Sequence, residues 1–151
     1  MHIANLHPIM IVEDSDDDYE ATERALKKDG RLANPVIRFE NGEDAVRYLL
    51  NEGPYADSRQ FLQPIIILLD LNLPGGGGLH ALSRIKAVPK LSTIPIVVLT
   101  SSGDRRDVEK CYEAGANTYV QKPVELDSLF TAVQQLKDYW LGLALLPGEN
   151  A

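Results

Sequence analysis

The sequence predicts an α/β fold, a doubly wound parallel sheet of five strands with five helices on its two faces. Three observations predict this fold. Short runs rich in Ile and Val recur along the 151 residues, segments with helical spacing of apolar residues separate them, and the connections are mostly short. The apolar runs are mostly continuous rather than alternating, which is typical of strands buried on both faces of a parallel sheet.

The apolar runs place the five strands. In chain order they cover residues 9–12, 36–39, 65–69, 96–99 and 118–120. The third is the most uniform, because each of its five positions is Ile or Leu. Strands joined through intervening helices connect in one hand and run parallel, so all five are expected to share one sheet.

The segments between the strands have the spacing of amphipathic helices. They are predicted at residues 16–29, 43–51, 79–88 and 104–114, and from residue 126 onward. Gly30, Gly53, Pro89 and Gly115 follow the first four and supply the ends that helices commonly have. The last helix carries the longest apolar stripe, made of Leu126, Leu129, Phe130, Val133, Leu136 and Trp140.

Composition narrows the classes of function. Hydrophobic residues make up 44% and charged residues 25%, which excludes disordered and fibrous proteins. The net charge of −7 argues against nucleic-acid or membrane binding, and no apolar run approaches the roughly 20 residues of a membrane span. Cys111 has no second cysteine to pair with and no secretory signal is visible, so a cytoplasmic protein is expected.

Charged and hydroxyl side chains follow the ends of four predicted strands. They are Glu13 and Asp14 after the first, Asp70 after the third, Thr100 after the fourth and Lys122 beyond the fifth. In an open parallel sheet, ligands bind at the carboxyl ends of the strands, where the strand order reverses. Three carboxylates gathered there repel one another unless a cation neutralises them, and Mg²⁺ prefers such oxygen ligands. The pattern predicts a magnesium site that is open to a phosphoryl group.

Each of these residues also has a simpler interpretation. The acidic run at 13–18 is typical of a helix N-terminus, where carboxylates face the positive end of the helix dipole. Thr100 suits a loop hydroxyl that bonds the local backbone, and Lys122 suits a solvated surface lysine. Asp70 fits such a role less well, because an unpaired carboxylate after five apolar residues is costly to bury. Their joint occurrence at successive strand ends favours a functional site.

Four motifs, in this order, carry a family resemblance. They are Ile11-Val12-Glu13-Asp14, Leu69-Asp70-Leu71-Asn72-Leu73-Pro74 with Gly78 further on, Leu99-Thr100-Ser101, and Val120-Gln121-Lys122-Pro123. Over about residues 8–138 the chain resembles the receiver domains of two-component response regulators, which implies a flavodoxin-like sheet of order 2-1-3-4-5. Finer details, among them Asp18 and a polar insert at 53–63, resemble the stand-alone regulators paired with phytochromes.

The resemblance implies a role for each site residue. Asp70 is the expected phosphoacceptor, whose carboxylate attacks the phosphorus of a phosphohistidine. Glu13, Asp14, Asp70 and the backbone carbonyl of Asn72 are the expected Mg²⁺ ligands. Lys122 is expected to pair with the phosphoryl oxygens.

Two further positions belong to the same resemblance, and one departs from it. Thr100 is expected to hydrogen-bond a phosphoryl oxygen, and Tyr119 occupies the switch-aromatic position on the fifth strand. Ser101 is small, which leaves the acceptor accessible to a bulky donor. The family usually has Asp or Asn where this chain has Gly77, so the third helix is expected to lack a side-chain N-cap.

The resulting hypothesis is a single-domain response regulator, a signalling phosphoacceptor rather than an enzyme acting on a separate substrate. A histidine kinase, of the phytochrome type, is the expected donor, and partner proteins are expected to take the output. Alternatives are a phosphorelay intermediate that passes the phosphoryl group onward, and a Mg²⁺-dependent aspartyl-phosphate phosphatase. The phosphatase would need an acid at Asn72, and a flavin or nucleotide carrier would need a glycine- or hydroxyl-rich loop after the first strand.

The ends of the chain raise the question of self-association. Residues 1–7 are expected to be an extension, 8–138 the receiver domain, and 139–151 an apolar continuation of the last helix. The apolar residues beyond Trp140 exceed what one packed face can bury, so we expect a twofold homodimer through the fourth helix, fifth strand and fifth helix. The alternative is a tail that folds back over its own domain.

Overall fold

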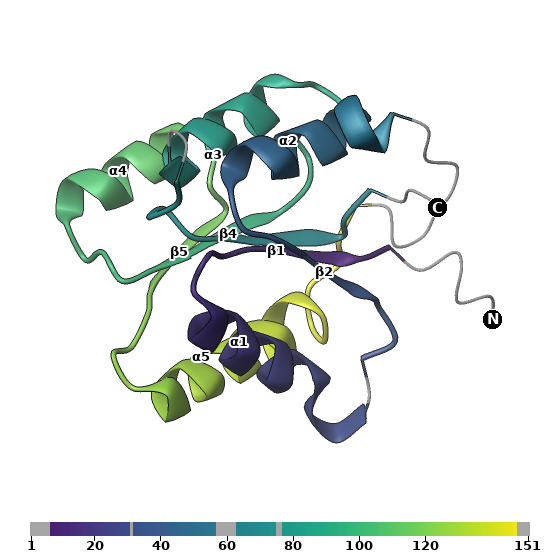
Figure 1. Ribbon diagram of the computed structural model, residues 1–151. Coiled ribbons are helices and arrows are strands. Elements are labelled where there is room, and N and C mark those ends of the chain that lie inside the picture. Colours follow the sequence, from purple (N-terminus) through teal and green to yellow (C-terminus); the bar gives the residue numbers. More distant parts are fainter. Residues whose placement is uncertain (1–6, 31, 57–62, 75–76, 148–151) are drawn as a thin grey trace.

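The computed structural model describes residues 7–30, 32–56, 63–74 and 77–147, and Figure 1 shows a central sheet between two layers of helices. The strands are β1 (Ile9–Val12), β2 (Val36–Phe39), β3 (Ile66–Leu69), β4 (Ile96–Thr100) and β5 (Thr118–Gln121). The helices are α1 (Asp16–Lys27), α2 (Gly42–Leu50), α3 (Gly77–Ala87), α4 (Arg105–Glu113) and α5 (Leu126–Trp140), with 3₁₀ turns η2 (Lys28–Gly30) and η3 (Gly53–Tyr55).

The sheet is doubly wound. Its strand order is β2-β1-β3-β4-β5, and each neighbouring pair is parallel, which confirms the order implied by the family resemblance. Helices α1 and α5 cover one face, and α2, α3 and α4 cover the other (Figure 1). The strand order reverses between β1 and β3, so the crevice where such sheets bind ligands lies at the carboxyl ends of these two strands.

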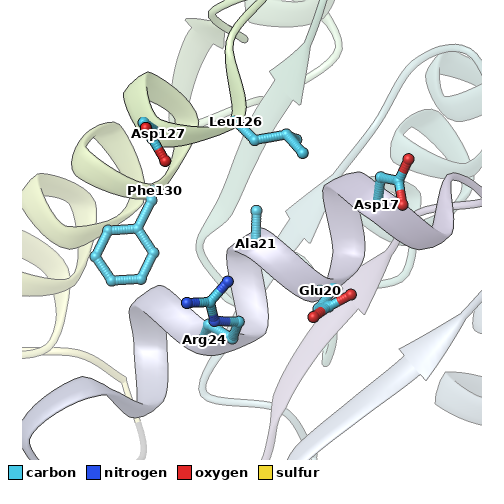
Figure 2. Close-up of a pocket in the computed structure, with 7 residues that line it drawn as sticks. All are labelled: Asp17, Glu20, Ala21, Arg24, Leu126, Asp127 and Phe130. Atoms are coloured by element: carbon cyan, nitrogen blue, oxygen red, sulfur yellow. The ribbon is translucent and has the colours of Figure 1, made fainter.

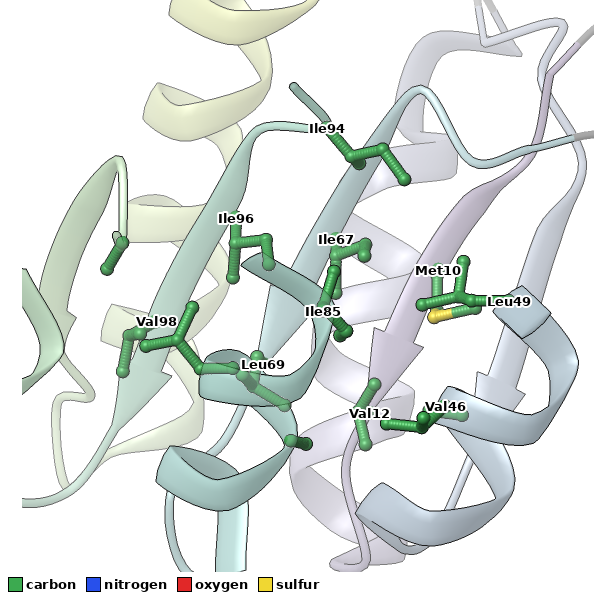
Figure 3. Packing of buried hydrophobic residues seen from close by; sticks show 14 of the residues in the cluster. Met10, Val12, Val46, Leu49, Ile67, Leu69, Ile85, Ile94, Ile96 and Val98 are labelled. Carbon is green, nitrogen blue, oxygen red and sulfur yellow. The ribbon is translucent and has the colours of Figure 1, made fainter. Parts of the chain in front are cut away.

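Alternate residues of each strand pack on opposite sides of the sheet, because successive side chains point to opposite faces. Met10 and Val12 of β1 face α2 and α3, as Figure 3 shows, whereas Ile9 and Ile11 belong to the core beneath α1 and α5. Both faces of β1, β3 and β4 are buried, which explains why their sequences are continuously apolar.

Helices α1, α2 and α4 each have a side-chain N-cap. Ser15, Asn41 and Asp104 each accept a hydrogen bond from a backbone N–H in the first turn of α1, α2 and α4. Such caps satisfy donors that have no partner inside the helix. The α1 cap bears directly on function, because it fixes the first turn of the helix that follows Glu13 and Asp14.

Most predicted helix boundaries are shifted by one residue, and two of them differ by two residues. Helix α1 ends at Lys27 rather than Asp29, because Asp29 has a φ of 73° and cannot continue a right-handed helix. Helix α3 begins at Gly77, two residues earlier than predicted, although glycine is a poor helix former. Gly77 has a φ of 78°, which favours glycine, and a side chain at Gly78 would collide with the carbonyl oxygen of Asp70.

The segment after α5 folds back in part. Leu146 is buried in the core beneath α1 and α5, and Trp140, Leu141 and Ala144 pack against the same cluster. Leu143 and Leu145 stay 74% and 88% exposed. The tail therefore covers its own domain at Leu146 while leaving two leucines to solvent. In the described part of the chain, no helix has the length and hydrophobicity to cross a membrane.

Candidate functional site

The carboxyl ends of β1 and β3 bring three carboxylates together. These strands pair with Val12 opposite Leu69, and the backbone N–H of Asp70 donates to the carbonyl of Val12 at 3.0 Å. Glu13 and Asp14 therefore emerge beside Asp70, and one oxygen from each lies within 4.8 Å of the others. Glu13 and Asp70 are buried, whereas Asp14 is exposed. The carboxylate cluster is therefore shielded from solvent at Glu13 and Asp70 and open to solvent at Asp14.

Lys122 lies just beyond β5 and reaches into this cluster. Its Nζ atom lies 2.6 Å from Glu13 Oε1, 3.1 Å from Asp70 Oδ2 and 2.9 Å from Asp18 Oδ2. The lysine side chain is only 7% exposed, so its charge is held largely out of water. A buried ammonium is tolerated because these carboxylates compensate it.

Burial and charge shift the protonation of the cluster. Burial raises the pKa of Glu13 to about 7, and the nearby Asp70 charge acts in the same direction, although Lys122 opposes both. Burial also works against ionisation of Asp70, but the Lys122 ammonium and the Asn72 N–H outweigh it and lower the pKa of Asp70. Burial alone would lower the pKa of Lys122, and hydrogen bonds to Glu13 and Asp18 instead hold that pKa well above its usual value.

The carboxylates of Glu13 and Asp70 thus differ in their readiness to react. The pKa of Asp70 lies below its ordinary value, so this carboxylate is ionised at neutral pH and is able to act as a nucleophile. The backbone N–H of Asn72 donates to Asp70 Oδ1 at 3.2 Å and orients the group.

Thr100 carries a buried hydroxyl at the carboxyl end of β4. Within the described residues Thr100 Oγ1 has no hydrogen-bond partner, although the residue is completely buried. The hydroxyl is still near enough to Asp70 to help lower the pKa of that carboxyl. A buried polar atom without a partner is costly, and native proteins contain few of them. This hydroxyl is free to bond a ligand held on Asp70.

Tyr119 connects the loop after β4 to β5. Its hydroxyl donates to the carbonyl of Ser102 at 2.8 Å, and its backbone N–H donates to the Tyr112 hydroxyl at 3.1 Å. Ser102 in turn donates from Oγ to Asp107 Oδ2 at 2.6 Å. Tyr119 is therefore hydrogen-bonded to the loop that follows Thr100 and Ser101.

A groove lies between α1 and α5 near their N-terminal ends, with a volume of about 290 Å³ (Figure 2). Its floor is apolar and its rim is mostly acidic. The lining residues are Asp17, Glu20, Ala21, Arg24, Leu126, Asp127 and Phe130. Because α1 follows Asp14 and α5 follows Lys122, the groove begins next to the carboxylate cluster.

The structure brings together Glu13, Asp14, Asp70, Thr100 and Lys122, as the strand-end argument predicted. Asn72 also lies beside Asp70, through its backbone N–H. Sequence reasoning missed the contact of Asp18 with Lys122, because an acid in the first turn of a helix already has an explanation in the helix dipole. Asp18 lies in the first turn of the helix that directly follows Glu13 and Asp14, and this closeness to the strand end is the signal that could have indicated it.

Comparisons with known proteins agree with this arrangement. The family model of the response regulator receiver domain matches residues 9–134. Response regulator Rcp1 of Synechocystis sp. is 38% identical over 139 residues, which cover 92% of each chain. The phosphorylated cyanobacterial phytochrome response regulator RcpA matches with a TM-score of 0.88 at 36% identity, covering 95% of this chain and 99% of that one. The Mn²⁺-bound form of Rcp1 matches with a TM-score of 0.87 at 37% identity, covering 94% and 99%.

Proposed function

This chain belongs to the response regulator receiver domain family, and on that premise we propose that it is a single-domain phosphoacceptor that takes a phosphoryl group on Asp70. The observation that carries the proposal is the ionised, buried carboxylate of Asp70 with Lys122 3.1 Å away and an unpartnered Thr100 hydroxyl nearby. The match over 92% of this chain and 92% of Rcp1, which is named a response regulator, supports the proposal.

The reaction is an in-line displacement at phosphorus. An Asp70 oxygen forms a bond to the phosphorus of a phosphohistidine, the phosphorus–nitrogen bond breaks, and the imidazole leaves with the bonding electron pair. The leaving nitrogen takes a proton, and Asp70 becomes an acyl phosphate. In such transfers the protein mainly positions the groups and stabilises charge on the phosphoryl oxygens. Lys122 and the Thr100 hydroxyl supply that stabilisation.

The carboxylate cluster fits a divalent cation, and we assign it to Mg²⁺. Glu13, Asp14 and Asp70 offer hard oxygen donors within 4.8 Å of one another, and the backbone carbonyl of Asn72 is the further ligand implied by the family. When bound, the ion neutralises charge on the carboxylates and on the transferred group. Exposure of Asp14 on one side leaves room for the waters that Mg²⁺ retains.

A histidine kinase of the phytochrome class is the proposed donor. RcpA is described as a phytochrome response regulator, and the family match extends over nearly all of this chain. The groove between α1 and α5 is the proposed docking surface, since it begins at Asp17, next to the Asp18 that contacts Lys122, and combines an apolar floor with an acidic rim. A helix with apolar and basic residues is complementary to it in both respects.

A second copy of the chain is the other proposed partner. Tyr112 on α4 and Tyr139 on α5 are 49% and 53% exposed, and β5 is an edge strand of the sheet. Between β5 and α5 lies a groove of about 460 Å³ lined in part by Leu136 and Trp140. An exposed apolar face of this kind next to a strand edge favours a twofold interface through α4, β5 and α5.

Phosphorylation by a small phosphodonor tests the proposed function. We expect acetyl phosphate with Mg²⁺ to add one phosphoryl group to the wild-type protein, and we expect no labelling when Mg²⁺ is chelated. The Asp70→Asn variant should remain folded and unlabelled, because the amide is not a nucleophile. Asp16→Asn is the matched control, since it removes one negative charge from an exposed position outside the groove. Stoichiometric labelling of Asp70→Asn would disprove the assignment.

A further inference from the structure

We propose that Asp18 is a positioning residue for phosphoryl transfer, which holds the Lys122 ammonium in place while the other partners of that lysine change their roles. The proposal rests on the proposed function of Asp70 and Lys122. It concerns a residue outside the carboxylate cluster, since Asp18 lies in the first turn of α1 rather than at a strand end.

The hydrogen-bonding capacity of Lys122 is fully used. An ammonium group has three N–H donors, and Lys122 Nζ has three carboxylate partners: Glu13 at 2.6 Å, Asp18 at 2.9 Å and Asp70 at 3.1 Å. Three bonds in three directions fix the rotation of the group about its last carbon–nitrogen bond. A charge-assisted bond of this length is among the stronger polar contacts in a protein.

The reaction changes two of these three partners. Glu13 and Asp70 are proposed metal ligands, and Asp70 also becomes the acyl phosphate, so neither remains a simple carboxylate partner of Lys122. Asp18 has neither role. It is therefore the contact that can persist from the resting site to the phosphorylated one. With one N–H held by Asp18, the other two stay directed toward Glu13 and toward the group on Asp70.

Asp18 is itself well anchored. Its backbone N–H donates to Ser15 Oγ at 3.3 Å, and its carbonyl accepts from the Thr22 hydroxyl at 2.8 Å. Helix α1 packs directly on α5 through the core that Leu129 and Val133 share with Ala21 and Ala25. The Asp18 side chain is 29% exposed, so water can reach it, but its backbone is as fixed as the helix. This combination suits a support for Lys122 rather than a group that reacts.

Phosphorylation kinetics with a small donor provide the test, because acetyl phosphate does not use the docking groove. We expect Asp18→Ala to slow phosphorylation roughly tenfold at saturating Mg²⁺, the effect of losing one charge-assisted contact that orients a catalytic group. The Mg²⁺ dissociation constant should stay within about twofold of the wild-type value, because Asp18 is not a ligand. Asp18→Asn, which keeps an oxygen acceptor, should lie between the two.

Asp16→Asn is the matched control, since it removes the same charge from an exposed residue of the same helical turn that does not line the groove, and it should match the wild-type rate. A rate for Asp18→Ala equal to or above the wild-type rate would overturn the proposal. So would a loss of Mg²⁺ affinity in proportion to the loss of rate, because Asp18 would then act on the metal rather than through Lys122.

A measurement on the metal-free protein separates this proposal from the proposed function. Lysine ammonium groups give observable ¹H–¹⁵N signals when hydrogen bonds slow their proton exchange, and Lys122→Met identifies the signal by removing it. We expect the Lys122 signal in the wild type and in Asp16→Asn, and its loss in Asp18→Ala. An unchanged signal in Asp18→Ala would refute the anchoring role, whereas failure of wild-type phosphorylation would refute only the proposed function.

Discussion

Thr100 combines complete burial with a hydroxyl that lacks a hydrogen-bond partner among the described residues. Thr22 is equally buried, yet its hydroxyl donates to the Asp18 carbonyl at 2.8 Å. The two threonines therefore differ in what their hydroxyls contribute to folding. A buried hydroxyl without a partner costs stability, whereas a paired one is roughly neutral or favourable. The difference agrees with the proposed role of Thr100 toward a ligand on Asp70.

Replacement of each hydroxyl by a methyl group tests this distinction. We expect Thr100→Val to leave the free energy of unfolding unchanged or raise it by up to about 1 kcal/mol, while slowing phosphorylation. Thr22→Val should instead lower it by about 1 kcal/mol and leave phosphorylation nearly unchanged. Urea titration and a phosphorylation time course measure the two properties. Marked destabilisation by Thr100→Val together with an unchanged rate would contradict the assigned role.

At the scale of elements, the ends of β1, β3 and β5 determine the charge balance of the site. Lys122 faces Glu13, Asp18 and Asp70 at once, and Asp14 lies beside Glu13 and Asp70. The negative charges outnumber the positive one, and like charges that share a site repel. A bound divalent cation would therefore stabilise the folded protein as well as prepare it for reaction.

Thermal unfolding with and without Mg²⁺ checks this expectation. A ligand that binds only the folded state stabilises by about 2.7 kcal/mol at one hundred times its dissociation constant, so we expect Mg²⁺ to raise the Tm of the wild type clearly. Asp14→Ala should lose most of this shift, and without metal it should be at least as stable as the wild type, because one repelling charge is gone. A wild-type Tm that does not respond to millimolar Mg²⁺ would rule out the metal assignment.

The elements themselves could largely be predicted from the sequence, because burial on both faces makes strands continuously apolar. The predicted bounds of β1 and β2 are those of the structure, and the other strands differ by one residue at one end. The start of α3 could not be predicted from helix propensity. Gly77 takes a φ of 78°, which favours glycine, and Gly78 leaves no room for a side chain against the carbonyl of Asp70, so backbone conformation and tertiary packing set this start.

The candidate site was predictable to the extent that parallel strands end at one edge of the sheet. This rule located Glu13, Asp14, Asp70, Thr100 and Lys122. It says nothing about side chains that reach the edge from a helix, and for that reason Asp18 was missed. Nor does it predict the contact of Tyr119 with Ser102, which depends on how the loop after β4 turns.

At the scale of the whole molecule, the distribution of exposed apolar residues separates two possible dimer contacts. Tyr139 belongs to the α4–β5–α5 face, whereas Leu145 lies in the segment after α5 and is 88% exposed. Removal of residues 140–151 would not distinguish the two contacts, because it would also remove Leu146 from the core beneath α1 and α5. Single substitutions at exposed positions leave that core intact.

Light scattering coupled to size exclusion tests the dimer through these positions. We expect a dimer mass for the wild type and for Leu145→Ser, and a monomer mass for Tyr139→Glu, because a buried charge at a twofold interface is placed there twice. A monomer mass for the wild type, with or without a phosphoryl analogue, would contradict the dimer. A monomer mass for Leu145→Ser together with a dimer mass for Tyr139→Glu would place the dimer contact in the segment after α5 instead.

The central claim is that Asp70 becomes an acyl phosphate, and chemical trapping tests it most directly. Borohydride reduces an acyl phosphate of aspartate to homoserine, so peptide mass spectrometry after phosphorylation and reduction identifies the modified residue. We predict homoserine at position 70, in Mg²⁺-treated protein only, and no homoserine in Asp70→Asn. Homoserine at Asp14, or none in wild-type protein that carries a phosphoryl group, would contradict the claim.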